Sequence, residues 1–179
     1  MRVIAGQYGG RRLKSPPSAT RPTADRVREA LFSTLGPLEG LRVLDLFAGS
    51  GALAIEALSR GAAEAVLVDS DRRAARVAQA NLDELGAGDA ARVLCVSAGA
   101  AADRLVGEGR TFDLVFLDPP YAEAAALLAG LEPALGQLTA PGARIVVESD
   151  RRDAPGPDLP MVHERRYGDT AIRIFSARE

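Results

Sequence analysis

The sequence RVLDLFAGSGALA, residues 42–54, decides the fold. Its apolar run, 42–46, is typical of a buried strand, and a helical pattern over 53–60 follows the glycine loop. Gly49 and Gly51 lack side chains at the junction, so a ligand can touch the backbone where free N–H groups and the helix dipole point. The stretch therefore predicts a strand, loop and helix unit that binds a ligand at the loop.

Apolar runs and helical patterns alternate along the rest of the chain. Strands are expected over 42–46, 65–69, 92–96, 112–117 and 143–147, with helices over 53–60, 72–85, 98–106 and 122–138. This alternation predicts a parallel sheet covered on both faces. Two final runs, 161–166 and 170–177, flank Tyr167-Gly168-Asp169 and predict an antiparallel hairpin. We expect an α/β, doubly wound, mostly parallel, seven-stranded Rossmann-like sheet that ends in this hairpin.

The N-terminal segment differs from the rest of the chain. Residues 3–8 and 11–14 flank Gly9-Gly10 and predict a β-hairpin arm over 1–20. A helical pattern then begins at Pro22 and Thr23 and stops at Gly36-Pro37, which predicts a helix leading into the core. We expect two parts, the arm (1–20) and a single globular domain (21–179).

Composition narrows the function classes. The chain has 179 residues and a formal net charge of −2, but residues 1–28 carry +6 and the remainder −8. A basic arm is typical of a segment that neutralises phosphates, although a solvated tail has the same charge. No apolar run is long enough for a signal peptide or a membrane span, so we expect a cytoplasmic protein. The single cysteine, Cys95, is expected to be a buried strand residue.

Two acids near the glycine loop bear on the choice of cofactor. Asp69 ends the second strand, where its carboxylate can accept hydrogen bonds from the two hydroxyls of a ribose. With Ala54, the loop also matches the loose G-x-G-x-x-G/A fingerprint, so it does not by itself separate S-adenosylmethionine from NAD. Asp45 at the loop mouth repels a pyrophosphate and attracts the cations of S-adenosylmethionine, unless it only braces the loop. Asp71 is expected to cap the helix from Arg72.

A second loop, Asp118-Pro119-Pro120-Tyr121, ends the fourth strand. The amino group of a nucleobase is a poor nucleophile, and the Asp118 carboxylate and Pro119 carbonyl are two acceptors able to orient its hydrogens and its lone pair. The prolines stiffen the loop, and Tyr121 offers a face on which an extruded base can stack. Taken alone, the same sequence is also a good strand end. Beside the glycine loop, it predicts methyl transfer to an amino group.

Two stretches extend these motifs to the rest of the chain. They are RVIAGQYGGRRL, residues 2–13, and RPTADRVREALF, residues 21–32; YGDT, residues 167–170, lies near the end. With the two loops, they resemble the small-subunit ribosomal RNA guanine-N2 methyltransferase family, the RsmD type, among class I S-adenosylmethionine-dependent methyltransferases. The resemblance covers essentially the whole chain.

The resemblance implies a bacterial enzyme that methylates the N2 amino group of a guanine in 16S rRNA, on an assembled or assembling small subunit. The residues it implies for the base are Asp118, Pro119, Pro120 and Tyr121. Those for S-adenosylmethionine are Asp45, Phe47, Ala48, Gly49, Gly51, Asp69, Ser70, Ser97 and Ala98, with Thr23 and Arg26 closing over the methionine end. RNA contacts are expected from Arg2, Arg11, Arg12, Lys14 and Arg21. We expect a monomer without a metal site.

Several alternatives stay open at this point. Methylation of adenine N6 in DNA or RNA would use the same Asp-Pro-Pro-Tyr chemistry, and an NAD-binding oxidoreductase or a nucleotide-binding module is a remote possibility. Ser97 stands where such enzymes often have Asp or Asn to bind adenine, so adenine recognition is open. Glu148, at the end of the fifth strand, either touches the cleft or caps the next loop.

Overall fold

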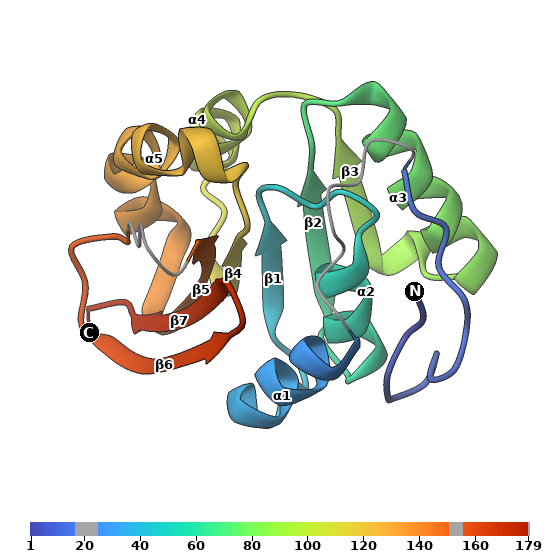
Figure 1. Ribbon diagram of the computed structural model, residues 1–179. Coiled ribbons are helices and arrows are strands. Elements are labelled where there is room, and N and C mark those ends of the chain that lie inside the picture. The colour runs from blue at the N-terminus through green and yellow to red at the C-terminus, as the bar shows by residue number, and fades with distance from the viewer. Residues whose placement is uncertain (17–24, 151–155, 179) are drawn as a thin grey trace.

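The computed structural model describes residues 1–16, 25–150 and 156–178 (Figure 1). Its elements follow the order α1 (Asp25–Leu35), β1 (Arg42–Asp45), α2 (Ala52–Ser59), β2 (Glu64–Val68), α3 (Arg72–Leu85), η1 (Gly88–Ala90), β3 (Ala91–Leu94), α4 (Ala98–Gly107), β4 (Phe112–Leu117), η2 (Tyr121–Glu123), α5 (Ala124–Leu138), β5 (Thr139–Asp150), β6 (Met161–Tyr167) and β7 (Thr170–Ser176). Among these helices, none combines the length and apolar character needed to cross a membrane.

In the described part of the chain, seven strands form one sheet in the order β3-β2-β1-β4-β5-β7-β6. The strands from β3 to β5 pair in parallel, whereas β7 pairs antiparallel to both β5 and β6. This confirms the mostly parallel sheet and its terminal hairpin. The chain winds outward from β1 to β3 and then returns to place β4 on the other side of β1. The winding direction therefore reverses between β1 and β4, where such sheets bind ligands.

Helices cover both faces of the sheet. Val43 of β1 belongs to a core cluster shared with α1, α2 and α3, whereas the next residue, Leu44, belongs to a second cluster shared with α4 and α5. Leu114 and Val115 of β4 divide between the clusters in the same way. Successive side chains of a strand point to opposite faces, so the continuous apolar runs of the sequence supply both cores.

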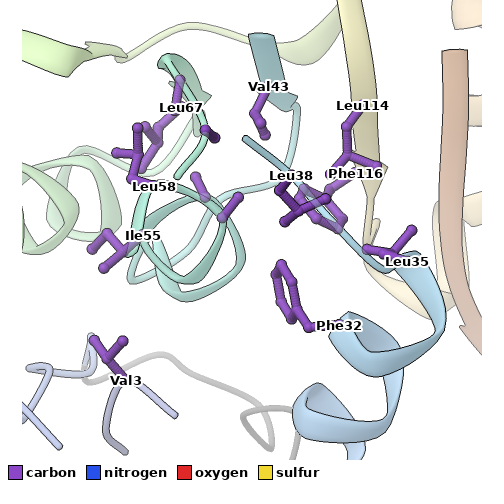
Figure 2. Close-up of a cluster of buried hydrophobic side chains, with 14 of the residues drawn as sticks. Val3, Phe32, Leu35, Leu38, Val43, Ile55, Leu58, Leu67, Leu114 and Phe116 are labelled. Carbon is purple, nitrogen blue, oxygen red and sulfur yellow. The ribbon is translucent and has the colours of Figure 1, made fainter. Parts of the chain in front are cut away.

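The leading helix, α1, anchors the first of these clusters. Figure 2 shows Phe32 and Leu35 of α1 in one group with Leu114 and Phe116 of β4. The rings of Phe32 and Phe116 lie 5.9 Å apart between centroids. The helix ends at Gly36, whose φ of 68° favours glycine. The expected helix and its stop are confirmed, while its predicted start at Pro22 and Thr23 lies outside the described residues.

The N-terminal arm is not the regular hairpin that the sequence predicts. Its two halves pair antiparallel at an isolated bridge between Arg2 and Arg12, with backbone hydrogen bonds from Val3 to Arg11 and from Leu13 to Met1 on either side, but they form no regular strands. The N–H groups of Ile4 and Ala5 donate instead to the carboxylate of Glu56 in α2, at 2.7 and 3.1 Å. The arm therefore divides its backbone N–H groups between its own two halves and helix α2. Val3 completes this contact, because its side chain is buried in the first core cluster (Figure 2).

The prediction for Cys95 is wrong, and that for Asp71 is confirmed. Strand β3 ends at Leu94, and Cys95 is exposed. The reason is that β3 is an edge strand, so an apolar run there is not enclosed on every side. Asp71 caps α3, since its carboxylate accepts the N–H of Arg73 at 2.8 Å.

Candidate active site

A cavity of about 810 Å³ opens at the carboxyl ends of β1 and β4, where the winding of the sheet reverses. Both predicted loops line it: Asp45, Phe47, Ala48 and Gly49 from the first, and Asp118, Pro119 and Pro120 from the second. Asp69, Ser70, Ser97 and Ala98 of the expected set also line it. The volume lies within the range of sites that enclose small molecules. The structure therefore brings the two loops to one cavity, as the sequence predicts.

The glycine loop owes its shape to Asp69. One carboxylate oxygen accepts the N–H of Gly49 at 2.8 Å, and the other accepts the N–H of Asp71 at 2.9 Å. Each oxygen retains lone-pair capacity for a further donor. Gly49 has a φ of 55°, and a Cβ there would meet no other atom within 4 Å. The loop thus presents open backbone to the cavity.

Gly51 serves packing and does not line the cavity. Its φ is 82°, and a Cβ would lie 2.8 Å from the side chain of Leu67 and 3.2 Å from that of Ile55. The absent side chain lets α2 start close against β2. Sequence reasoning placed both loop glycines beside the cofactor, but the wall of the cavity contains only Gly49 of the two.

Asp45 is a buried charge without a partner. Its side chain is 1% exposed, and neither carboxylate oxygen has a hydrogen bond. Burial raises the pKa of Asp45 to about 7, and the charge of Asp69 adds to this rise; the N–H groups of Phe47 and Ala54 lie near enough to offset it in part, although their geometry is too poor for hydrogen bonds. A buried carboxylate without hydrogen-bond partners destabilises a fold. The oxygens of Asp45 are therefore suited to binding a ligand that carries a cation or a hydrogen-bond donor.

Asp118 and Glu148 form a carboxylate pair on the other side of the cavity. Burial raises the pKa of Asp118 well above its ordinary value, and the charges of Glu148 and Asp45 raise it further. Glu148 lies within β5, two residues before its end, and lines the cavity, so of the two roles left open for it the contact with the cleft is the one observed. Perturbed carboxylates in one cavity are typical of a functional site. A cation placed among them would restore their ionised forms.

The remaining expected residues fall in different places. Ser97 caps α4, because its hydroxyl oxygen accepts the N–H of Ala100 at 3.3 Å while the residue lines the cavity. Arg26 lies outside this cavity and borders a separate surface depression with Arg165. Tyr121 begins the short helix η2, but its side chain lies outside the described part of the structure. Thr23 and Arg21 also lie outside the described residues.

Sequence reasoning missed Arg28, Glu123 and Leu127 in the cavity wall. Arg28 is the most telling of them, since its side chain is 1% exposed. It stands four residues before Phe32 and seven before Leu35, on the buried face of α1. An arginine in line with the apolar stripe of a helix was the signal available.

The basic residues of the arm lie at the surface. Arg2 and Lys14 pair with Asp25 and Glu84 at 3.7 and 2.9 Å, and their side chains are about two-thirds exposed. Arg11 donates to the carbonyl oxygen of Glu84 at the end of α3, whereas Arg12 is exposed. Such exposed pairs are weak and can exchange for phosphates. The arm thus presents a basic surface supported by the domain beneath it.

Comparison with known proteins agrees with this site. Residues 1–176 match the family described as Conserved hypothetical protein 95. Ribosomal RNA small subunit methyltransferase D of Escherichia coli is 39% identical over 98% of this chain and 89% of its own length. The chain belongs to this methyltransferase family. The putative rRNA methyltransferase YlbH of Bacillus subtilis is 40% identical over 99% of this chain and all of its own length. The family resemblance seen in the sequence is confirmed.

A solved structure supports the same assignment. The putative methyltransferase yhhF from Escherichia coli superimposes with a TM-score of 0.86 and 37% identity, over 99% of this chain and 98% of that one. The arm, the leading helix and the terminal hairpin are thus compared along with the sheet. Methyltransferase membership therefore rests on the entire fold rather than on the glycine loop alone.

The cavity residues fit S-adenosylmethionine. Its ammonium and sulfonium groups are cations, and Asp45 offers two buried oxygens without partners. Asp69 retains acceptor capacity for ribose hydroxyls, and Gly49 leaves room for close approach. No phosphate is needed to satisfy any of these groups. The acids of the cavity oppose the pyrophosphate of NAD, the other cofactor compatible with the loop.

Proposed function

We propose that this protein transfers a methyl group from S-adenosylmethionine to the exocyclic N2 amino group of a guanine in 16S ribosomal RNA. One observation carries the proposal: Asp118-Pro119-Pro120 and the glycine loop line the same cavity. Bound S-adenosylmethionine supplies an electrophilic methyl group on a sulfonium. The chain's own residues have to hold the base, orient its nitrogen and receive a proton.

Asp118 and Pro119 orient the amino group. The ionised Asp118 carboxylate and the Pro119 carbonyl accept its two hydrogens, which directs the nitrogen lone pair at the methyl carbon. With the donor bound, its methyl group would pass from the sulfonium to this nitrogen, and Asp118 is placed to accept the proton that the positively charged amine releases. The raised pKa of Asp118 suits this last step, because the burial that raises it favours the protonated carboxyl. Tyr121 supplies the stacking face for the extruded base.

The other side of the cavity binds the cofactor. We assign the ribose hydroxyls to Asp69, the ammonium to Asp45 and close backbone contact to Gly49, with Phe47, Ala48, Ser70, Ser97 and Ala98 around the nucleoside. Gly51 supports this loop through packing. Thr23 and Arg26 remain candidates to close over the methionine end when the complex forms. Ser97 uses its hydroxyl oxygen to cap α4, so adenine contacts fall to backbone atoms and to the hydroxyl hydrogen.

The arm binds the RNA. Arg2, Arg11, Arg12 and Lys14 are exposed on one segment, and Arg21 follows them in the sequence. Phosphate contacts of this kind position an enzyme without reading sequence, so the folded small subunit supplies the specificity. We propose that the protein acts as a monomer in the cytoplasm, on an assembled or assembling subunit.

Transfer of tritiated methyl tests the proposal. Unmodified small ribosomal subunits and duplex DNA are offered separately, and labelled nucleosides are separated after digestion. We expect label in N2-methylguanine from 16S rRNA with the wild type, and roughly 100- to 1000-fold slower labelling with Asp118→Ala. Label in N6-methyladenine, or in DNA alone, would overturn the substrate and favour the adenine alternative.

A further inference from the structure

Arg28 carries an unusual set of contacts for a buried arginine. Its Nη2 donates to the carbonyl oxygen of Arg2 and, at 2.9 Å, to a carboxylate oxygen of Asp25. Its Nε and Nη1 are buried and have no hydrogen-bond partner. The protein thus satisfies Nη2 of this guanidinium and leaves the donors of Nε and Nη1 unpaired. Native proteins rarely leave buried donors unpaired, and such exceptions often mark a ligand position.

The direction of α1 places this guanidinium at the cavity. The carbonyl of Leu35, at the end of the helix, accepts a hydrogen bond from Arg144, which pairs with Leu114 early in β4. Phe32 packs on Phe116, later in the same strand. The helix therefore runs from the carboxyl edge of the sheet back to the amino edge. Arg28, one turn before Phe32, reaches the carboxyl edge and lines the cavity beside the glycine loop.

The charges of the cavity wall are strongly unequal. Six acidic side chains line it: Asp45, Asp69, Asp71, Asp118, Glu123 and Glu148. Among the described wall residues, Arg28 has the one cationic side chain. The methyl donor carries two cations and one carboxylate. The acids suit its cations, whereas Arg28 supplies the one side chain of the described wall that attracts its carboxylate.

A further correspondence concerns the unpaired atoms. In the described part of the chain, the buried charged atoms without hydrogen-bond partners belong to Asp45 and Arg28, which line the same cavity. The methionine end of the donor has one ammonium and one carboxylate on the same carbon. Two unpaired protein charges of opposite sign thus match two ligand charges of opposite sign. Burial also lowers the pKa of Arg28, an effect that an incoming carboxylate would oppose.

We infer that Arg28 binds the carboxylate of the methionine end of S-adenosylmethionine, donating from Nε and Nη1, while Asp45 binds the ammonium. This inference rests on the cofactor of the proposed function and adds a residue to its site. Arg28 becomes a specificity residue, because it distinguishes the complete amino acid from a nucleoside that lacks the carboxylate. Its bond to Arg2 also ties this binding position to the base of the arm.

The competing interpretation is structural. Through Nη2, Arg28 fastens the arm to α1, and its loss would then weaken every ligand of the cavity equally. The two roles are separated by a pair of ligands that differ only at the carboxylate. S-adenosylhomocysteine has it, and its decarboxylated form, 5′-deoxy-5′-(3-aminopropylthio)adenosine, keeps the amine and the nucleoside.

Isothermal titration of both ligands gives the test. We expect the wild type to bind S-adenosylhomocysteine roughly 10- to 100-fold more tightly than the decarboxylated form, as for a charge-assisted hydrogen bond. In Arg28→Met the ratio should fall to about 3 or less, through loss of affinity for S-adenosylhomocysteine alone. The matched control is Arg144→Met, which removes a half-buried arginine bound to the backbone of α1, away from the cavity. It should keep the wild-type ratio.

Each outcome decides the matter. An unchanged ratio in Arg28→Met, or equal loss for both ligands, would assign Arg28 a structural role only. Should Arg28→Met fail to fold, the wild-type ratio still decides, since a ratio near 1 overturns the inference. Binding of neither ligand would remove the cofactor and this inference together. A retained ratio without methyl transfer to the small subunit would overturn the proposed substrate and leave Arg28 in its place.

Discussion

Two carboxylates, those of Glu56 and Asp45, are equally buried but differ in their hydrogen-bond partners. Glu56, in α2, is 0% exposed, and it accepts the N–H groups of Ile4 and Ala5 and, at 2.8 Å, the guanidinium of Arg60. Asp45, at the end of β1, is 1% exposed and has no hydrogen-bond partner. The protein itself supplies the hydrogen-bond and ion-pair partners of Glu56, whereas those of Asp45 are left for a ligand to supply.

The difference separates architecture from function. A buried charge that finds all its partners within the chain joins two segments, as Glu56 joins the arm to α2. A buried charge left incomplete costs stability and is retained where a ligand supplies the missing partner. Burial alone therefore does not identify a functional acid. The state of its hydrogen bonds does, and four experiments test that distinction.

Removing Asp118 should give the largest effect. In Asp118→Ala the amino group loses an oriented acceptor, and methyl transfer to small subunits should fall roughly 100- to 1000-fold. Affinity for S-adenosylhomocysteine should change little, because Asp118 faces the base. Asp69→Ala is the converse variant and should lose cofactor affinity first. Equal losses of cofactor affinity in the two variants would contradict their separate roles.

Without ligand, Asp45→Asn should have a higher free energy of unfolding than the wild type, by a margin that grows as pH rises. The folded pKa of about 7 lies above the unfolded value near 3.9, so the folded state binds the extra proton. The stability that Asp45 contributes is present below about pH 4 and is lost as pH rises to about 7, a change of up to about 4 kcal/mol.

Urea unfolding of the wild type and of Asp45→Asn over pH 4 to 8 measures this effect. The difference between the two free energies of unfolding should grow in favour of Asp45→Asn across that window and then level off. The same variant should bind S-adenosylhomocysteine more weakly. A constant difference across the pH range would mean that Asp45 has a partner in solution.

Replacing Glu56 should have the opposite effect and lower the free energy of unfolding. Glu56→Gln removes the charge that pairs with Arg60 and weakens the acceptor for the arm, at a cost of about 3 kcal/mol in the free energy of unfolding. The control is Glu64→Gln, which breaks the half-exposed pair with Arg110 and should cost less than about 1 kcal/mol. If Glu56→Gln instead spared stability and abolished cofactor binding, the contrast with Asp45 would collapse.

The smallest expected effect concerns the arm's surface. Arg11→Ala combined with Arg12→Ala should weaken RNA binding modestly and reduce the slope of log affinity against log salt by about 1 to 2. Filter binding at several salt concentrations measures it. Arg92→Ala with Arg104→Ala, which removes two arginines paired with Glu108 away from the arm, should leave the slope unchanged. A slope unaltered in both double variants would exclude the arm from the interface.

Local signals in the sequence were enough for most of the fold. The helix Arg72–Leu85 was predicted to the residue, because a capping acid at Asp71 and a glycine at Gly86 enclose a clear helical period. Strand β4 was predicted equally well, because a continuous apolar run ended at a proline pair. Loops at the ends of parallel strands meet at one edge, so the shared cavity also followed from the sequence.

Tertiary context governed what the sequence did not reveal. The arm pairs over only a short stretch, and a carboxylate some 50 residues away in sequence, that of Glu56, accepts the next N–H groups, those of Ile4 and Ala5. Cys95 is exposed because β3 lies at the edge of the sheet, and an apolar run alone does not distinguish an edge strand from a central one. Arg28 was overlooked because arginines on helices usually face water, and only the packing of α1 shows that this one does not.

The contacts between the arm and the domain can form only after much of the chain has been synthesised. Because a chain is synthesised from its N-terminus, Ile4 is made before its partner Glu56, and Lys14 is made before its partner Asn81, 67 positions later. Until almost half of the chain has been synthesised, the basic arm therefore lacks these contacts with the domain. During that time it is attached to a ribosome, whose small subunit the finished enzyme is proposed to modify. The arm is thus synthesised before the residues of the domain on which it packs.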